Sequence, residues 1–211
     1  MPKKLISILL LVCLLPCLLL AETKANLKGK IIILDPGHGG SDSGATTAKL
    51  IEKNLNLEVA LRLEKLLTEV KAAVYLTRRD DRDVSLVERV RFFHKYQADA
   101  VISLHHNAKP YDPAADEVAV YRPSFPTPEA KRLANLISSE LVKATGNPRG
   151  ALGPANYYIL ENSRDLPIVI AEPYYLTHEK HIKLLQDSAT LDLEAEAYFN
   201  ALILFFDPTE R

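Results

Sequence analysis

The sequence predicts an α/β fold: a single domain in which helices cover both faces of a mostly parallel, twisted sheet as a three-layer αβα sandwich. Two observations predict it. Short runs rich in β-branched residues alternate along the chain with longer segments of helical periodicity. The 211 residues, of which 47% are hydrophobic and 25% charged, suit one globular domain with an ordinary core, and we find no internal repeat or linker.

The first half of the domain alternates strand and helix. Strands are expected at residues 30–34, 73–77 and 100–104, and helices at residues 53–70 and 86–96. The first helix is the clearest, because its apolar residues recur at steps of three and four along one face: Val59, Leu63, Leu66, Leu67 and Val70. That face is expected to pack on the sheet.

The second half continues with strands at residues 118–121, 157–160 and 168–171 and with helices at residues 128–145 and 189–206. Five prolines lie between the third strand and the first of these helices: Pro110, Pro113, Pro123, Pro126 and Pro128. Proline restricts φ and lacks a backbone donor, so this stretch is expected to be a stiff, irregular connection. We expect it to border a functional site.

The N-terminal segment is typical of a secretory signal peptide. Lys3 and Lys4 precede an apolar run over residues 5–20, and small and polar residues follow. The run is shorter than the roughly 20 apolar residues that a membrane span needs. We therefore expect export to the periplasm or the outside of the cell, with cleavage after Ala21 or Ala25 and no permanent membrane span.

Residues 1–25 are accordingly expected to be the signal segment, and residues 26–211 the mature domain. A lipid anchor on Cys17 is the alternative, ranked second because Pro16 stands where a small residue is usual.

Both cysteines, Cys13 and Cys17, lie in this segment, so the mature domain is expected to have no thiol nucleophile and no disulfide. Loss of the segment changes the formal net charge from −1 to −3, and no basic run is present, so nucleic-acid binding is not expected.

Two histidine-containing segments follow predicted strands. His38 lies among glycines in DPGHGG, directly after the first strand, and His105 and His106 follow the third strand. The carboxyl ends of strands in an open α/β sheet are where ligands bind, so these imidazoles are candidate metal ligands. Taken singly, His38 could be a turn with a polar tip, and His105 or His106 a hydrogen-bonded histidine at a loop edge.

Two glutamates are candidates for the same site. Glu52 precedes the helix at residues 53–70, where the helix dipole alone favours an acidic residue, and spacing alone supports that simpler interpretation. Glu172 follows the apolar strand at residues 168–171, where a carboxylate is seldom placed without a partner. Partial burial would raise the pKa of Glu172 and suit it to proton transfer near neutral pH.

The other charged residues receive simpler interpretations. Residues 78–83, RRDDRD, are expected to form a mixed-charge loop that is solvated or internally paired rather than catalytic. His94, His178 and His181 are expected to be surface or packing histidines.

Four segments resemble the zinc-dependent N-acetylmuramoyl-L-alanine amidases of bacterial cell walls. They are IIILDPGHGGSDSGA at 31–45, IEKNLNLEVALRLEKLL at 51–67, TRRDDRDVSLVERV at 77–90 and ADAVISLHHNA at 98–108. The similarity extends from about residue 30 to residue 206. It implies an exported hydrolase that cleaves the amide bond between N-acetylmuramic acid and the L-alanine of the peptidoglycan stem peptide.

The resemblance also implies the site residues. His38, Glu52 and His105 match the family's ligands for one Zn²⁺ ion, and Glu172 matches its catalytic glutamate. His106 falls where the family often has a small residue, so it is expected to be a neighbour of the site. Two histidines and one carboxylate leave a fourth position for water, which is the ligand set of a catalytic zinc.

The expected partner is peptidoglycan or muramoyl peptides, with Asn107 contacting the substrate and the chain acting as a monomer. Only a short Pro-rich stretch lies between Tyr121 and Ala130, whereas some family members carry a long helical insertion that blocks the zinc. No activator protein is therefore expected. Two alternatives stay open: an inactive peptidoglycan-binding module of the same fold, and a zinc peptidase that cuts within the stem peptide.

Residues 173–178 depart from the family pattern. After the glutamate the family usually continues with a small residue, Phe, a short residue and Asn, whereas this chain has PYYLTH. Tyr174 and Tyr175 are expected to be core or lip aromatics, with stacking on glycan or stem peptide as the alternative.

Overall fold

The computed structural model describes residues 26–207 and 209, so the expected signal segment at residues 1–25 lies outside the described residues. The described chain contains a six-stranded sheet with the strand order β2-β1-β3-β6-β4-β5. The strands are β1 (Ile31–Pro36), β2 (Ala73–Leu76), β3 (Ala100–Leu104), β4 (Val118–Arg122), β5 (Arg149–Pro154) and β6 (Ile168–Glu172). The helices are α1 (Glu52–Glu69), α2 (Leu86–Lys95), α3 (Pro128–Thr145), α4 (Tyr158–Glu161), α5 (Glu179–Leu184) and α6 (Ser188–Phe206).

Parallel pairing dominates the sheet. β1 pairs with β2 and with β3, and β3 pairs with β6, all in parallel. β4 runs antiparallel to β6, and β5 pairs with β4 in parallel at the edge. Parallel strands covered by helices are apolar on both faces, and Ile32, Ile33 and Leu34 of β1 accordingly have 0% exposure.

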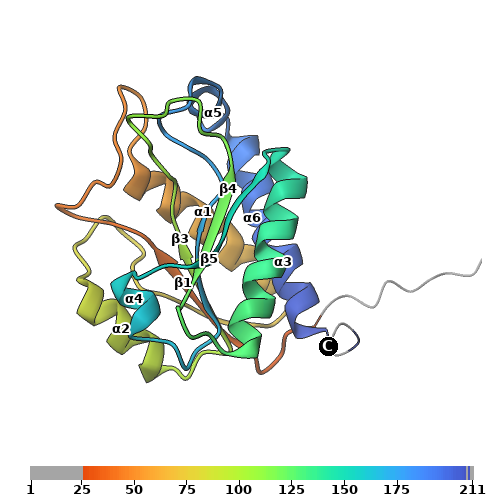
Figure 1. Cartoon of the computed structure of the whole chain (residues 1–211). Helices are drawn as coiled ribbons and strands as arrows, with labels where there is room; N and C mark the ends of the chain where they lie inside the picture. Colours follow the sequence, from red (N-terminus) through yellow and green to blue (C-terminus); the bar gives the residue numbers. More distant parts are fainter. Residues whose placement is uncertain (1–25, 208, 210–211) are drawn as a thin grey trace, which may run out of the picture.

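Helices cover both faces of the sheet (Figure 1). α1, α3 and α6 form one layer, in which α6 contacts both α1 and α3, while α2 and α4 lie together on the other face. The larger core cluster, with Leu63, Leu133 and Tyr198, lies on the α1, α3 and α6 side. The smaller cluster, with Phe93 and Leu160, lies on the α2 and α4 side. The predicted three-layer α/β fold is confirmed.

Local sequence sets the ends of α2 and α3. Ser85 and Glu88 form a capping box at the start of α2, because each side chain accepts a hydrogen bond from the other residue's backbone N–H. α3 begins with Thr127 as its cap and Pro128 in its first turn, and it ends at Gly146 with a φ of 68°. None of the helices in the described part of the chain has the length and hydrophobicity of a membrane span.

The prediction of a strand at residues 157–160 was wrong, because this segment leads into the short helix α4. Its aromatic and β-branched composition favours a strand, but the two tyrosines are exposed and the next two residues are buried, which is not the alternation of a strand. β5 and α5 were not predicted. The β5 sequence, RGALGP, has the glycines and proline of a loop, and α5 is too short to show a periodicity.

Candidate metal centre

Three sheet strands end side by side at the candidate site. Parallel pairing places Pro36 of β1 opposite Leu104 of β3, and Leu104 opposite Ala171 of β6. The residues that follow these positions therefore leave the sheet at the same edge, which brings His38, His105 and Glu172 to it. Glu52 comes to this edge as the first residue of α1.

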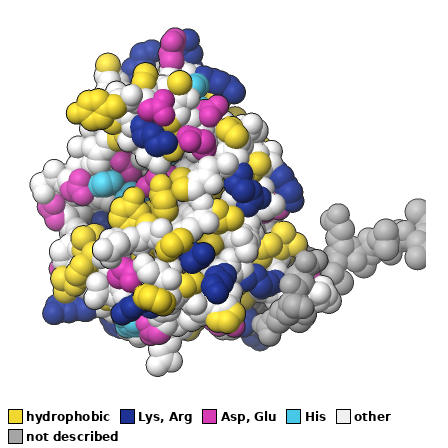
Figure 2. All heavy atoms as spheres, viewed as in Figure 1, with side chains coloured by type: hydrophobic (Ala, Val, Ile, Leu, Met, Phe, Trp, Pro, Cys, Tyr) yellow, Lys and Arg dark blue, Asp and Glu magenta, His cyan; other side chains and the backbone are white. Residues whose placement is uncertain are grey.

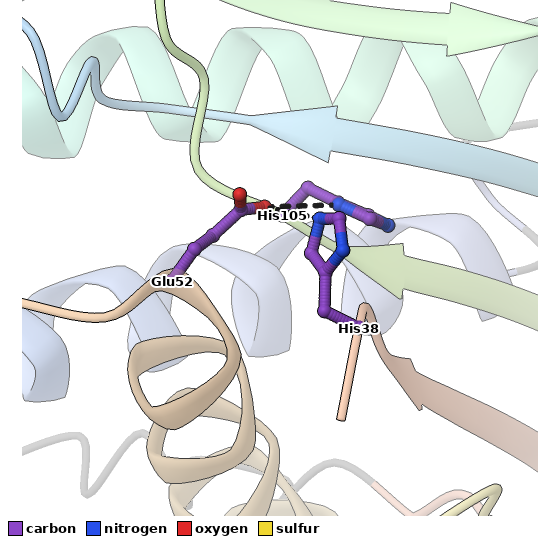
Figure 3. Close-up of side chains that lie close together, drawn as sticks. All are labelled: His38, Glu52 and His105. Atoms are coloured by element: carbon purple, nitrogen blue, oxygen red, sulfur yellow. Dashed lines mark hydrogen bonds and ion pairs between the residues drawn. The ribbon is translucent and has the colours of Figure 1, made fainter. Parts of the chain in front are cut away.

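His38, Glu52 and His105 form a compact group with their polar atoms turned toward one another (Figure 3). Glu52 Oε1 lies 3.1 Å from His38 Nε2 and 3.1 Å from His105 Nδ1. The centroids of the two imidazole rings are 4.9 Å apart, and the ring planes are nearly perpendicular, with an angle of 78° between them. Each residue offers one candidate ligand atom, and these atoms all lie within 4.8 Å of one another.

Backbone donors hold the carboxylate of Glu52 in place. The Ala45 N–H donates to Oε2 at 2.8 Å, and the His106 N–H donates to Oε1 at 3.2 Å. Burial alone would raise the pKa of Glu52, but hydrogen bonds and charge interactions with His105 and His38 outweigh it and hold the pKa well below its usual value. The buried carboxylate therefore favours positive charge beside it.

The loop after β1 presents the His38 ring to Glu52. His38 itself has a left-handed φ of 61°, and its Nδ1 lies 2.8 Å from Asp42 Oδ2, which turns Nε2 inward. A Cβ at Gly37 would overlap the ring of His105, and a Cβ at Gly44 would lie 2.5 Å from Glu52 Oε2. Glycine at these two positions is therefore required by close packing of the ligand groups.

Two buried arginines tie the backbone of this loop to its surroundings. Arg78 donates to the carbonyls of Gly37 at 2.9 Å and Lys53 at 2.7 Å, which joins the loop to α1. Arg89 of α2 donates to the carbonyl of His38 at 2.7 Å and pairs with Asp35. Residues 78–83 were expected to be solvated or paired within the loop, and Arg82 Nε does lie 3.7 Å from Asp80 Oδ1. For Arg78 the structure corrects this expectation, because its side chain is only 1% exposed and donates mainly to carbonyls outside the loop.

Glu172 ends β6 beside the histidines. Burial is the main cause of a raised pKa for Glu172, which the nearby His105 opposes and the Glu52 carboxylate reinforces. Tyr121 and Tyr157 pack edge to face, with ring centroids 5.5 Å apart. Burial is the main cause of the raised pKa of each phenol, and the charge of Glu172 adds to it. The Glu172 carboxyl therefore lies near aromatic side chains in a partly buried position, which suits a group that takes up and releases a proton.

The ligand group lies between two hollows. One, the aromatic hollow, has a volume of about 450 Å³ and is lined by Leu86, Tyr157, Tyr158, Ile159 and Glu172 together with the three candidate ligands. The other, the acidic hollow, has a volume of about 390 Å³ and is lined by Asp42, Asp83, Glu88 and Arg89 together with both ligand histidines. At the left of Figure 2, a histidine side chain reaches the surface between acidic side chains and a band of hydrophobic ones.

A sequence model of one protein family, described as N-acetylmuramoyl-L-alanine amidase, matches residues 32–203. The chain belongs to this amidase family. It is 30% identical over 185 residues to the amidase LytC of Bacillus subtilis, in a match that covers 88% of this chain and 37% of LytC. It is 32% identical over 203 residues to the germination-specific N-acetylmuramoyl-L-alanine amidase of the same species, which covers 87% of this chain and 84% of that protein.

The amidase-family fold is also evident from solved structures. The CwlD amidase of Clostridioides difficile, solved in complex with the GerS lipoprotein, superposes with a TM-score of 0.78 at 27% identity. That match covers 83% of this chain and 98% of CwlD. The chain spans little more than a third of the length of LytC.

Asn107 and His106, the two other residues that the sequence analysis singled out here, differ in their position at the site. Asn107 lines the aromatic hollow, but its Oδ1 accepts the Ala108 N–H at 2.8 Å, and its backbone pairs with Tyr174 and Leu176. His106 points away from the candidate ligands into the core and is 2% exposed. Its position as a neighbour outside the metal-ligand group agrees with the sequence interpretation.

The segment that departs from the family pattern is part of the core. Tyr174 and Tyr175 are 3% and 2% exposed, which confirms core packing and leaves little surface for stacking on substrate. His181 is buried, and its Nδ1 accepts the Tyr175 N–H at 2.9 Å while its Nε2 lies 3.3 Å from Asn147 Oδ1. The packing role expected for His181 is confirmed.

Sequence reasoning missed four residues that support the candidate ligands: Asp42, Asn56, Arg89 and Glu194. Asp42 carried a weak signal, since an acid four residues after a glycine-flanked histidine can reach the ring across a turn. The other three lie on helices at ordinary helical positions, and only the fold brings them to the site.

Proposed function

We propose that the chain hydrolyses the amide bond between N-acetylmuramic acid and L-alanine in peptidoglycan, using one zinc ion held by His38, Glu52 and His105. The observation that carries this proposal is the position of Glu52 Oε1, 3.1 Å from a nitrogen of each histidine, at the sheet edge where Glu172 also ends its strand. Membership of the amidase family supports the choice of bond.

The residues present suit zinc. Tetrahedral bonds of roughly 2.0–2.2 Å place neighbouring ligand atoms about 3.4 Å apart, and the observed separations from Glu52 are close to this value. The contact of Asp42 with His38 Nδ1 is the support that metal-binding imidazoles usually have. When bound, zinc would supply polarisation of the amide carbonyl and make a water molecule easier to deprotonate near neutral pH.

Glu172 is proposed to carry the proton. Its carboxylate removes a proton from the attacking water as the new C–O bond forms at the lactyl carbonyl. It then gives that proton to the L-alanine nitrogen as the C–N bond breaks, so the products are a lactyl carboxylic acid and a peptide with a free amino group. Its buried position and raised pKa support both steps, and no covalent bond to the enzyme is needed.

The two hollows support a substrate that extends past the metal group on both sides, as an internal amide bond requires. We propose that the exposed rings of Tyr157 and Tyr158, in the aromatic hollow, contact one part of the muramoyl peptide. Asn107 is proposed to contact the substrate from the same hollow.

The Glu172→Ala variant tests the mechanism. We expect it to bind zinc like the wild type and to lose activity by about 10²- to 10⁴-fold, because only the proton carrier is removed. Mass analysis of digested peptidoglycan checks the bond: wild-type products should include free peptides that begin with L-alanine. Full activity in the variant would contradict the proton-transfer role, and intact lactyl amides after digestion by the wild type would contradict the amidase reaction.

We further infer that residues 1–25 direct export and that residues 26–211 are the catalytic domain, acting as a monomer on the cell wall in the periplasm or outside the cell. The lysine-led apolar run supports the first point. The cell-wall enzymes among the relatives support the second.

A further inference from the structure

Three buried polar side chains connect the C-terminal helix to the candidate ligand Glu52. Glu194 of α6, His106 after β3 and Asn56 of α1 are 1%, 2% and 0% exposed. The proposed hydrolysis does not use them, although burying a charged carboxylate is unfavourable unless it is paired.

These side chains form a continuous series of contacts from Glu194 to Glu52. Glu194 Oε2 lies 3.2 Å from His106 Nε2, and His106 Nδ1 lies 2.8 Å from Asn56 Oδ1. Asn56 Nδ2 then lies 3.4 Å from Glu52 Oε1 and 3.3 Å from the carbonyl oxygen of Gly37. The backbone N–H of His106 also donates to Glu52 Oε1, at 3.2 Å.

The hydrogen-bond roles along this chain are determined by Asn56. Its amide nitrogen faces two acceptors, Glu52 Oε1 and the Gly37 carbonyl, so its oxygen must face His106. His106 Nδ1 must then carry a hydrogen in order to donate to that oxygen. His106 Nε2 faces Glu194 Oε2, and the other oxygen of Glu194, Oε1, has no hydrogen-bond partner among the described residues.

Glu194 anchors the far end of this chain of contacts. Its Oε2 contacts His106 Nε2 from α6, and the opposite nitrogen of the same ring contacts Asn56 Oδ1. A side chain at position 194 that cannot hydrogen-bond would leave the His106 ring and the Asn56 amide without this support. The Asn56 nitrogen would then no longer be held against Glu52 Oε1.

We propose that Glu194, acting through His106 and Asn56, is a positioning residue that orients the Glu52 carboxylate for metal binding. The inference rests on the proposed metal site. Outer partners of ligand groups typically contribute a factor of about 10 to 100 in metal affinity, and the buried chain of contacts gives Glu52 such partners on its Oε1 side.

The test is zinc affinity, measured by competition with a chelator, in Glu194→Leu and in a matched control. Leucine is similar in size to glutamate but cannot hydrogen-bond His106. Glu196 lies two residues further along α6 and is exposed, so Glu196→Leu makes the same change on the same helix away from the contact chain. We expect Glu194→Leu to weaken zinc binding by about 10- to 100-fold and Glu196→Leu to leave it unchanged. Circular dichroism establishes that each variant is folded.

A second variant covers the case in which Glu194→Leu does not fold. Asn56→Leu breaks the chain next to Glu52 with a side chain of similar size and leaves Glu194 paired with His106, and we expect a similar loss of zinc affinity. A folded variant of either kind that binds zinc as tightly as wild type overturns the inference. A wild-type chain that binds no zinc would instead contradict the proposed function, so the two failures are distinguishable.

Discussion

At the scale of single residues, Glu52 is the most constrained group of the candidate site. One oxygen accepts the Ala45 N–H, and the other lies close to both histidines and to the His106 N–H. Its place at the start of α1 explains why sequence spacing alone favoured an ordinary helix-terminus acid: both interpretations use the same position. The contacts that distinguish them come from the loop before the helix and the strand end at His105.

Glu172 gives a pH prediction. A glutamate that must accept a proton is active only when ionised, and burial raises the pKa of Glu172 above the ordinary 4.5. Activity should therefore fall as the pH drops through this raised pKa, above the pH at which a solvated glutamate is protonated. The acid limb of kcat/KM against pH measures it, with zinc content followed at each pH to separate metal loss. An acid limb at or below pH 4.5 would contradict the role.

At the scale of elements, the loop between β1 and α1 is held by hydrogen bonds that other elements donate to its carbonyls. Arg78 follows β2 and Arg89 lies on α2, and together they hold the carbonyls of Gly37 and His38. The ring of His105 then packs where a side chain at Gly37 would lie. Arg89 of α2 thus holds the backbone of His38, and the loop after β1, through Gly37, leaves the space that the His105 ring fills.

This packing predicts the effect of Gly37→Ala. The added methyl group overlaps the His105 ring, so we expect zinc affinity and activity to fall by about tenfold or more, with a stability loss of about 1–3 kcal/mol. Gly153→Ala is the control, because no atom outside its chain neighbours lies within 4 Å of a Cβ there. Chelator competition and thermal unfolding measure both variants. Equal zinc affinity in the two would show that the His105 ring has room to move.

Most elements could be predicted from the sequence pattern. The five-residue strand β3 and the long helix α3 have the predicted bounds. The other predicted helices and the strands β1, β2, β4 and β6 differ from the prediction by one or two residues at their ends. The failure at residues 157–160 has a physical cause: a four-residue apolar run carries no periodicity, and packing on the sheet decided its conformation. The contacts of Glu194 with His106, 88 residues away in sequence, could not be read from local pattern at all.

At the scale of the whole molecule, the candidate site is reached from solvent without a covering helix in the described residues. β4 and α3 are joined by residues 123–127 only, and the side chains of His38 and His105 are 24% and 19% exposed. This short connection is the reason why the sequence analysis predicted that no activator protein is needed.

We therefore expect the purified domain of residues 26–211 to hydrolyse peptidoglycan without an added protein. Release of free stem peptides with time, with and without zinc, measures it, and the Glu172→Ala domain serves as the blank. The GerS lipoprotein in the CwlD structure shows that one solved relative forms a complex with another protein. Activity that begins only after a lipoprotein or another partner is added would contradict the expectation.

The strand order has a consequence for the folding of this chain. β1 lies between β2 and β3, and Asp35 accepts a hydrogen bond from Ser103, 68 residues further along. Such non-local pairing forms slowly, because long loops must close before the contacts reward them. The candidate ligands His38 and His105 meet only after β1 and β3 have paired, so a chain that is still being synthesised would not yet carry the assembled candidate site.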